Sequence, residues 1–259
     1  MIFVLVLIII VSWLIGFIVL NDFSVPSISV KAKRILFVFP HPDDEISVGG
    51  LIKHVAIHYG FVSLAILTRG ERGTTDGHLC EQLKIIRREE MLKSAENLSV
   101  TKLIHKDFGD GKLAQKKLFL SKYLHKLIDR VKPDLVITYD LSGLYGHEDH
   151  MVVSEIVTKL LHNNFPKIDL WYTTRPQKVI QMARLPEHMA KDLSFKTKRS
   201  LPTHKFFIGL NFIYKIKSIL SHNSQKQSFR NPLPKLIPLW FVVSTQLFEY
   251  YFVTSANKK

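Results

Sequence analysis

The chain has 259 residues, of which 46% are hydrophobic and 22% charged, so it can bury a large core and is too apolar to be disordered. Its 36 Lys and Arg exceed its 22 Asp and Glu, and residues 151–259 carry 17 basic against 5 acidic side chains, a net charge of +12. A single cysteine, Cys80, excludes an internal disulfide framework and favours a reducing compartment. We expect one globular domain.

The first twenty residues predict a transmembrane helix. They contain no Asp, Glu, Lys, Arg or His, and at about 1.5 Å per residue they reach the roughly 30 Å of a hydrocarbon core. A cleaved signal peptide would need a basic start, a shorter apolar run and a small-x-small cleavage site, and a buried core helix would show an apolar stripe. The basic residues Lys31, Lys33 and Arg34 follow the span, so the positive-inside rule places the remaining chain in the cytoplasm.

Residues 21–32, with Pro26, are interpreted as a short linker, and residues 33–259 as the domain that it connects to the anchor. Short β-rich runs alternate there with helical patterns, as in a mostly parallel sheet covered by crossover helices on both faces. The apolar runs ILFVF and LVIT are continuous, which is typical of strands buried on both faces. We predict strands at 35–39, 62–68, 103–105, 135–139 and 168–173, and helices at 48–59, 81–98, 118–131 and 150–163.

Beyond about residue 180, basic and aromatic residues are interleaved without a clear period. The ordinary interpretation is a solvated basic face over core aromatics, and the functional one is contact with anionic lipid headgroups. Nucleic acid is disfavoured because no recognised binding motif accompanies the charge. Residues 236–253 are apolar but contain Pro238 and Glu249, so we expect a core or, at most, an interfacial segment.

A first polar cluster, Pro-His-Pro-Asp-Asp-Glu at 40–45, follows the first predicted strand. Ligands of open α/β sheets bind beyond the carboxyl ends of the strands, where this cluster lies. One imidazole and two adjacent carboxylates can supply two metal ligands and leave one carboxylate as a base. Helix capping by Asp43 or Asp44 is the alternative, but it does not explain His41 or three consecutive acids.

A second cluster, Gly-His-Glu-Asp-His at 146–150, follows the strand at 135–139. Two histidines separated by an acidic pair can give one ligand to a metal and leave the other imidazole near the reacting group. A polar surface loop is the alternative, since the chain has 12 His. Two such clusters at matching strand ends favour a catalytic zinc site with three protein ligands, and other divalent metals remain alternatives.

These motifs together resemble the PIG-L/LmbE-like deacetylases, and the likeness spans roughly residues 33–250. It also includes LTRGERG at 67–73, FGDGKL at 108–113 and SHNSQ at 221–225, and LTRGERG is closer to the bacterial branch of the family. The resemblance implies a Rossmann-like fold and a zinc-dependent amidase that acts on N-acetyl sugars. It makes His41, Asp44 and His150 the metal ligands, and Asp43 the base that activates water.

The same resemblance implies roles for residues around that centre. His147 would polarise the acetyl carbonyl or stabilise the oxyanion, and Asp149 would orient His147. Arg87 and Asp110 would contact the sugar, although an exposed Arg87–Glu90 pair and an ordinary Asp-Gly turn are the alternatives. The roles of His222 and Gln225 stay open.

The leading hypothesis is therefore removal of the acetyl group from an N-acetylglucosamine-type sugar that is lipid-linked or membrane-proximal. One alternative is the same reaction on a soluble N-acetyl sugar conjugate, which gains little from a tethered enzyme. The other is a non-catalytic, membrane-anchored binder of anionic glycolipids. Such a binder would not need both polar clusters.

Overall fold

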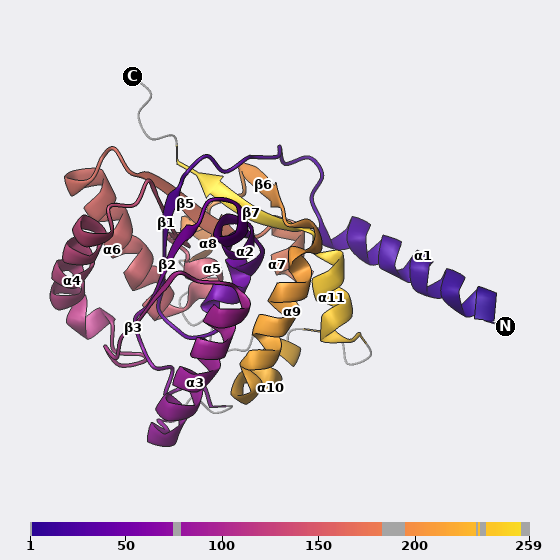
Figure 1. The fold of residues 1–259 in the computed structure, drawn as a ribbon, viewed down its shortest axis with the longest axis horizontal. Coiled ribbons are helices and arrows are strands. Elements are labelled where there is room, and N and C mark those ends of the chain that lie inside the picture. Colours follow the sequence, from indigo (N-terminus) through magenta and orange to yellow (C-terminus); the bar gives the residue numbers. More distant parts are fainter. Residues whose placement is uncertain (1, 75–78, 183–194, 232, 234–236, 255–259) are drawn as a thin grey trace.

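The computed structural model describes residues 2–74, 79–182, 195–231, 233 and 237–254. Its centre is a seven-stranded sheet in the order β3-β2-β1-β4-β5-β7-β6 (Figure 1). The first five strands are parallel to their neighbours, as predicted, and β7 runs antiparallel to both β5 and β6. The strands are β1 Arg34–Phe39, β2 Phe61–Ile66, β3 Lys102–His105, β4 Leu135–Tyr139, β5 Asp169–Thr174, β6 His204–Phe207 and β7 Phe248–Val253.

Helices cover both faces of the sheet, which confirms the predicted α/β class. The longer ones are α2 Gly49–His58, α3 Glu81–Asn97, α4 Lys117–Val131, α6 Glu148–Asn164 and α9 Phe212–Ser221. The shorter ones are α5 Gly143–Gly146, α7 Gln177–Met182, α8 Phe195–Lys198, α10 Lys226–Arg230 and α11 Leu239–Thr245, with 3₁₀ turns at η1 Asp44–Val48, η2 Ala114–Lys116, η4 Gly209–Asn211 and η5 Asn223–Gln225.

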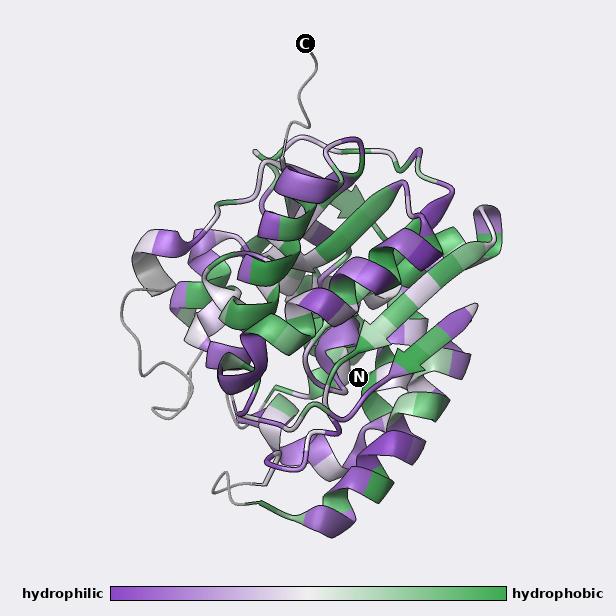
Figure 2. Ribbon diagram, turned by 90° about the vertical axis from the view of Figure 1, so that its left-hand side faces the viewer, coloured by the Kyte–Doolittle hydropathy of each residue, from purple (hydrophilic) through white to green (hydrophobic). Residues whose placement is uncertain are grey.

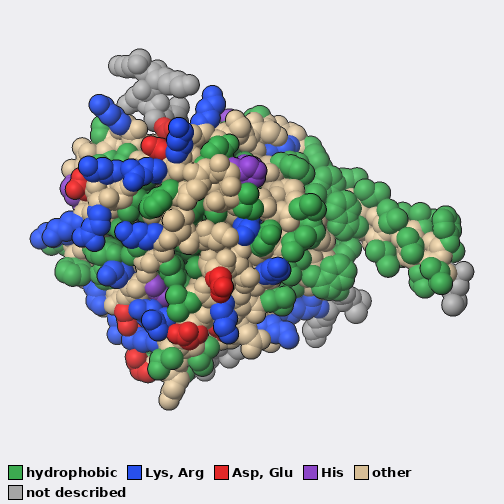
Figure 3. All heavy atoms as spheres, viewed as in Figure 1, with side chains coloured by type: hydrophobic (Ala, Val, Ile, Leu, Met, Phe, Trp, Pro, Cys, Tyr) green, Lys and Arg blue, Asp and Glu red, His purple; other side chains and the backbone are tan. Residues whose placement is uncertain are grey.

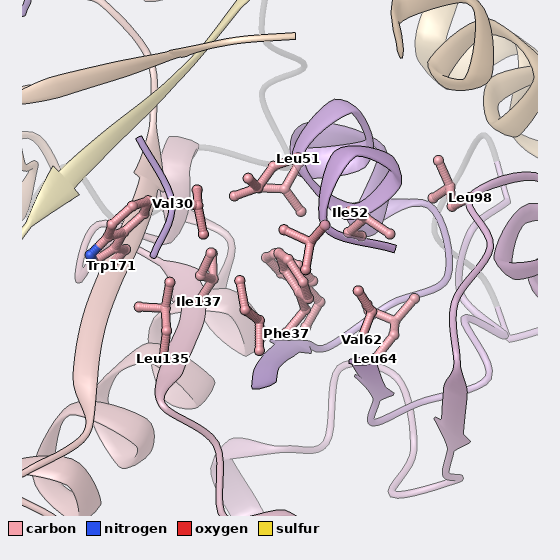
Figure 4. Packing of buried hydrophobic residues seen from close by; sticks show 14 of the residues in the cluster. Val30, Phe37, Leu51, Ile52, Val62, Leu64, Leu98, Leu135, Ile137 and Trp171 are labelled. Atoms are coloured by element: carbon pink, nitrogen blue, oxygen red, sulfur yellow. The ribbon is translucent and has the colours of Figure 1, made fainter. Parts of the chain in front are cut away.

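The central strands are apolar on both faces because each face packs against helices. Along β1, Ile35, Phe37 and Phe39 belong to one core cluster, while Leu36 and Val38 belong to the other. Figure 4 shows the first cluster, in which side chains of α2 lie over Phe37. The second cluster is closed by α4 and α6. Figure 2 shows the result, with mostly hydrophobic strands and helices of mixed polarity. This double burial explains the continuous apolar runs in the sequence.

The last two strands of the sheet order, β7 and the edge strand β6, were not predicted. The segment 236–253, expected as core or interfacial, divides into α11 and β7 over its described part. Within it, Tyr251 is fully buried and pairs with β5, whereas Trp240 is 58% exposed. Glu249 is also buried, because its carboxylate accepts hydrogen bonds from the Gly50 and Leu51 amides at the start of α2. This acceptor satisfies helix-end amides that would otherwise lack a partner.

Helix α1, Ile2–Leu20, projects from the body and has no buried residue (Figure 1). It is the one helix in the described part of the chain that is long and apolar enough to cross a membrane, on length and composition alone. Its second half touches α11, where the Trp13 indole donates to the Ser244 hydroxyl at 3.2 Å. The adjoining residues 21–32, predicted as a linker, pack on the domain because Asn21 and Val30 are buried.

Candidate active site

The two polar clusters meet at the carboxyl edge of the sheet. Strands β1 and β4 are parallel neighbours, so the loops that follow them lie side by side. His41 Nδ1 is 3.2 Å from His150 Nε2, and the ring of His147 lies 4.7 Å from that of His41 and 4.6 Å from that of His150, between ring centroids. The pairing of β1 with β4 therefore brings together two clusters that are more than a hundred residues apart in the sequence, as expected.

The three predicted metal ligands lie together and are buried. Asp44 Oδ2 is 3.5 Å from His41 Nδ1, and Asp44 Oδ1 is 3.3 Å from His150 Nε2. The Asp44 carboxylate also accepts the Tyr139 hydroxyl at 3.1 Å and the His41 amide at 2.8 Å. These bonds hold the carboxylate against both imidazoles, so neither Asp44 nor Asp43 serves as the ordinary helix cap considered above.

The tautomers of the two imidazoles suit a cation. His150 Nδ1 lies 3.2 Å from the Gly143 carbonyl, which can only accept, so Nδ1 carries the proton and Nε2 presents its lone pair. His41 Nε2 lies 3.1 Å from Asp110 and 3.2 Å from Asp149, so in the neutral ring Nδ1 presents its lone pair. Two nitrogen lone pairs and a carboxylate oxygen then face one another, and a divalent cation is the partner that satisfies all three.

Gly143 makes the His150 contact possible. It has a positive φ of 62°, and a Cβ at this position would lie 2.8 Å from the Cβ of His150. Only glycine combines this left-handed backbone with so close an approach to the helix that carries the ligand. This glycine lies in the loop between the strand at 135–139 and the second polar cluster, and its role becomes visible only in the folded chain.

His41 also belongs to a second group of donors. Ligand atoms of His41, His147 and His150 lie within 4.8 Å of one another, and so do those of His41, Asp110 and Asp149. Burial by itself lowers the pKa of the His41 imidazole, but the carboxylates of Asp110, Asp149 and Asp44 outweigh it and raise that pKa well above its usual value. The surroundings of His41 thus favour positive charge, which a bound cation also supplies.

Asp43 lies beside this cluster without touching the imidazoles. Its φ is 96°, a conformation that costs a non-glycine residue about 1–3 kcal/mol and is concentrated at functional sites. One carboxylate oxygen is 2.9 Å from the Arg87 guanidinium. Burial raises the pKa of Asp43 to about 6, with Arg87 opposing the shift and Asp44 and Glu45 adding to it. A carboxyl group with this pKa can accept and return a proton near neutral pH.

Arg87 is buried and organises the loop that holds Asp43. Its guanidinium donates to the Gly70 carbonyl at 3.0 Å, to the Pro42 carbonyl and to the Asp43 carboxylate. An exposed Arg87–Glu90 pair is therefore wrong, because Glu90 instead accepts the Ser224 amide and hydroxyl, each at 2.7 Å. The structure shows Arg87 bonded to protein groups, and its predicted contact with sugar stays a prediction.

Asp110 and Asp149 both face His41. Asp110 accepts the Arg72 amide at 2.9 Å, and Asp149 accepts the amides of Gly111 at 2.7 Å and Leu113 at 3.2 Å. The predicted orientation of His147 by Asp149 has no hydrogen bond to support it among the described residues. Asp149 instead contacts the ring of His41, because the backbone amides of Gly111 and Leu113 hold its carboxylate there.

His147 lies with His41 and His150, but the sequence analysis gave it no ligand role. Its Nδ1 is buried and lacks a hydrogen-bond partner within the described ranges. Burial, helped by the neighbouring His150 and His41, lowers the pKa of His147 to about 3. The ring is therefore neutral at physiological pH and keeps its hydrogen-bonding capacity for another group.

The sequence analysis did not predict the hydrogen-bond network of Glu45, which holds the backbone amide of Asp43. Glu45 accepts His222 Nε2 at 2.7 Å and the Ser94 hydroxyl at 2.5 Å, and its other oxygen accepts the Asp43 amide at 2.9 Å. The open question on His222 is thus answered by a buried ion pair with Glu45. Gln225 donates to the Gly73 carbonyl at 2.9 Å. The acidic run at 43–45 was the available signal, but it did not reveal its distant partners.

A mostly parallel α/β sheet, whose carboxyl edge carries a His/Asp cluster able to hold a metal, defines the class of this protein. Residues 36–161 match the PIG-L family, described as GlcNAc-PI de-N-acetylase. Diacetylchitobiose deacetylase of Thermococcus kodakarensis is 31% identical over 215 residues, covering 79% of this chain and 74% of that protein. The chain therefore belongs to the PIG-L family, as its motifs indicated.

Other comparisons agree on the fold. 1D-myo-inositol 2-acetamido-2-deoxy-alpha-D-glucopyranoside deacetylase of Salinispora arenicola is 28% identical, and the match spans 58% of each chain. The solved N,N'-diacetylchitobiose deacetylase of Pyrococcus horikoshii aligns with a TM-score of 0.58 and 23% identity over 87% of this chain and 85% of that one. A 4-carboxy-2-hydroxymuconate hydratase of Pseudomonas putida aligns with a TM-score of 0.57 and 20% identity over 82% and 83% of the two chains. The fold alone therefore does not decide the reaction.

Proposed function

We propose that this chain is a zinc-dependent hydrolase that removes the acetyl group from an N-acetylglucosamine-type sugar. The observation that carries the proposal is the convergence of His41, Asp44 and His150, with a free carboxylate at Asp43 beside them. Relatives named as deacetylases of diacetylchitobiose and of an acetamido-deoxyglucose conjugate support the substrate class. Other divalent metals with the same ligand preferences are the alternatives to zinc.

His41, Asp44 and His150 are the residues that would hold the ion. A bound zinc supplies Lewis-acid polarisation and acidifies water, which an amide requires because it is a poor electrophile. Asp110 and Asp149 hold His41 in the tautomer that a metal ligand needs, through contacts of 3.1 and 3.2 Å to Nε2. The protein thus fixes the donors before any ligand arrives.

Asp43 and His147 would divide the proton transfer and the charge stabilisation. Asp43 accepts the proton of the attacking water and returns it to the departing amine, and its bond to Arg87 fixes the carboxylate for both steps. The neutral His147 ring donates a hydrogen bond to the acetyl oxygen as negative charge develops there. Arg87 and Asp110 remain the proposed sugar contacts, with Arg87 acting also through the Asp43 loop.

We place this chemistry at a membrane. Residues 1–20 would be a single-pass anchor, residues 21–32 its connection, and residues 33–259 the catalytic domain on the cytoplasmic side. The length and composition of α1 and the basic residues that follow it support this arrangement. A tethered enzyme favours a lipid-linked or membrane-proximal sugar over a soluble one.

The test is amine release from three acetylated sugars by the purified full chain. Diacetylchitobiose and the N-acetylglucosamine–inositol conjugate are the soluble substrates, and N-acetylglucosaminyl-phosphatidylinositol in vesicles is the lipid-linked one. We expect hydrolysis that a chelator abolishes and zinc restores, fastest on the lipid. Preference for a soluble conjugate would support the first alternative, and glycolipid binding without amine release would support the non-catalytic binder.

A further inference from the structure

Large apolar side chains are exposed on the body around the base of α1. Five of them are more than two-fifths exposed: Phe23 51%, Phe207 55%, Leu210 76%, Ile213 42% and Trp240 58%. We call these five residues the apolar collar. They come from the segment after α1, from the β6–η4–α9 region and from α11, so the chain brings them together from three distant stretches. Figure 3 shows hydrophobic surface extending from α1 onto the body.

Aromatic contacts make part of the collar continuous with α1. The Trp13 ring stacks on Phe17 at 5.4 Å, Phe17 meets Phe23 at 5.3 Å, and Phe23 meets Phe248 at 6.1 Å, between ring centroids. Phe248 in turn meets Phe207 at 5.4 Å. An unbroken aromatic path thus leads from the middle of the apolar helix to the edge strand β6.

A second path joins α1 to α11. A Cβ on Gly16 would lie 3.3 Å from the Phe241 ring, and the Phe241 ring lies 6.0 Å from that of Trp240. The Trp13–Ser244 hydrogen bond secures the same contact. Three of the five collar residues, Phe23, Phe207 and Trp240, are therefore linked to α1 through side-chain contacts, and Leu210 and Ile213 follow Phe207 closely along the chain.

This surface lies at the edge of the sheet that carries the candidate site. Thr174, the last residue of β5, pairs with Tyr250, so Phe248 lies beyond the carboxyl end of β5. Phe207, which pairs with Phe248, is the last residue of β6. His41 follows the carboxyl end of β1, and β1 and β7 are separated by two strands, or about 14 Å across the sheet at the usual strand spacing.

Two lysines donate hydrogen bonds to backbone carbonyls just after α1, where this helix joins the body. Lys178 donates to the Asn21 carbonyl just past α1, and Lys205 donates to the carbonyls of Asp22 at 3.1 Å and Phe23 at 3.0 Å. Cations at the carboxyl end of a helix are favourable. Lys205 is buried, whereas the exposed Lys178 would lie in a bilayer at the height of the anionic headgroups, next to the collar.

We infer that the apolar collar inserts into the interface of the bilayer that α1 enters, and turns the catalytic edge of the sheet toward that bilayer. A lipid surface is the occupant that covers α1 on all sides and the collar at once, whereas a second copy of the chain would cover one side. The domain then takes its acetylated sugar from the membrane surface. This inference rests on the anchoring part of the proposed function and adds an orientation to it.

Site-specific fluorescence tests the insertion in the full chain reconstituted into phosphatidylcholine vesicles. In a Cys80→Ser background, Leu210→Cys and Leu118→Cys receive the same environment-sensitive nitrobenzoxadiazole label. The two leucines are matched, at 76% and 73% exposure, but Leu118 lies in the first turn of α4, on the side of the molecule away from α1 (Figure 1). We expect blue-shifted emission and quenching by spin-labelled lipid at 210 and water-like emission at 118. Equal, water-like emission at both positions would overturn the inference.

A blue shift at 210 without quenching by spin-labelled lipid would also overturn it, since a second copy of the chain would then cover the collar. A kinetic measurement separates the collar from the chemistry. The double variant Leu210→Ser/Trp240→Ser should lose at least fivefold in rate on the lipid-linked sugar and keep its rate on diacetylchitobiose. Equal loss on both substrates would contradict the orientation. Absence of amine release from every substrate, with lipid contact intact at 210, would refute the proposed function and leave the collar in place.

Discussion

The assignment of Asp43 as the proton carrier gives the sharpest test of the site. Asp43→Asn keeps the shape of the side chain and one oxygen for the Arg87 guanidinium, which lies 2.9 Å from the carboxylate. Asparagine is also among the residues that best tolerate the positive φ of 96°. The variant should therefore fold, and should lose only the ability to accept a proton.

General acid–base catalysis contributes about 10²–10⁴ in rate, which corresponds to about 2.7–5.5 kcal/mol of transition-state free energy. We expect a loss of this size in kcat, a smaller change in KM and full zinc content, measured by steady-state amine release and metal analysis. The matched control is Asp44→Asn, which should lose zinc because Asp44 contacts both imidazoles. The opposite metal contents would show that the two carboxylates are reversed. Normal turnover in both variants would refute the mechanism.

Further measurements address the neighbouring groups. His41→Ala and His150→Ala should each lower zinc occupancy, and full stoichiometry in both would refute the ligand set. His147→Ala should keep zinc and lose roughly 10²–10³ in kcat; a loss of metal would make it a ligand. His222→Ala leaves the buried Glu45 without its ion-pair partner, so the free energy of unfolding should fall by about 3–5 kcal/mol, and an unchanged denaturation midpoint would contradict this. A reporter fused after Lys259 should behave as cytoplasmic, and an external signal would reverse the topology. Burial lowers the pKa of His105 from 6.5 to about 4, and the charge of Arg69 adds to this shift. Because the unfolded chain binds a proton more readily than the folded one, the contribution of His105 to the free energy of unfolding is complete above pH 6.5. This contribution falls by at most about 3 kcal/mol as the pH is lowered toward 4. His105→Gln should flatten that part of the pH profile of unfolding.

The parallel half of the sheet could be predicted because its residues obey local rules. Strand β4 is buried at every position, and such a strand needs a continuous apolar run, which is visible without any knowledge of its neighbours. Helix α4 likewise shows its buried stripe directly in the sequence. Strand β7 was not predicted because its burial depends on distant partners, with Tyr251 packed in the core and Glu249 bonded to α2.

The candidate site shows the same division. The clusters at 40–45 and 146–150 could be paired from the sequence because the carboxyl ends of neighbouring parallel strands meet. The contacts of single carboxylates could not, since they depend on loops whose course is set by backbone amides. Asp149 was expected to contact His147. Its carboxylate contacts His41 instead, because the amides of Gly111 and Leu113 hold it there. Glu45 was visible in the motif, but His222 reaches it only through the fold.

The bond between Glu249 and α2 bears on how small a working fragment of this protein can be. The family match ends at residue 161. The amides at the start of α2 nevertheless find their acceptor in Glu249 of β7, almost ninety residues beyond the end of that match. A fragment truncated at the end of the match would leave the Gly50 and Leu51 amides uncapped. It would also lack β5, β7 and β6, and would expose β4 as an unpaired sheet edge. Such edges promote aggregation. Boundaries for recombinant production should therefore extend through Val253, the last residue of β7.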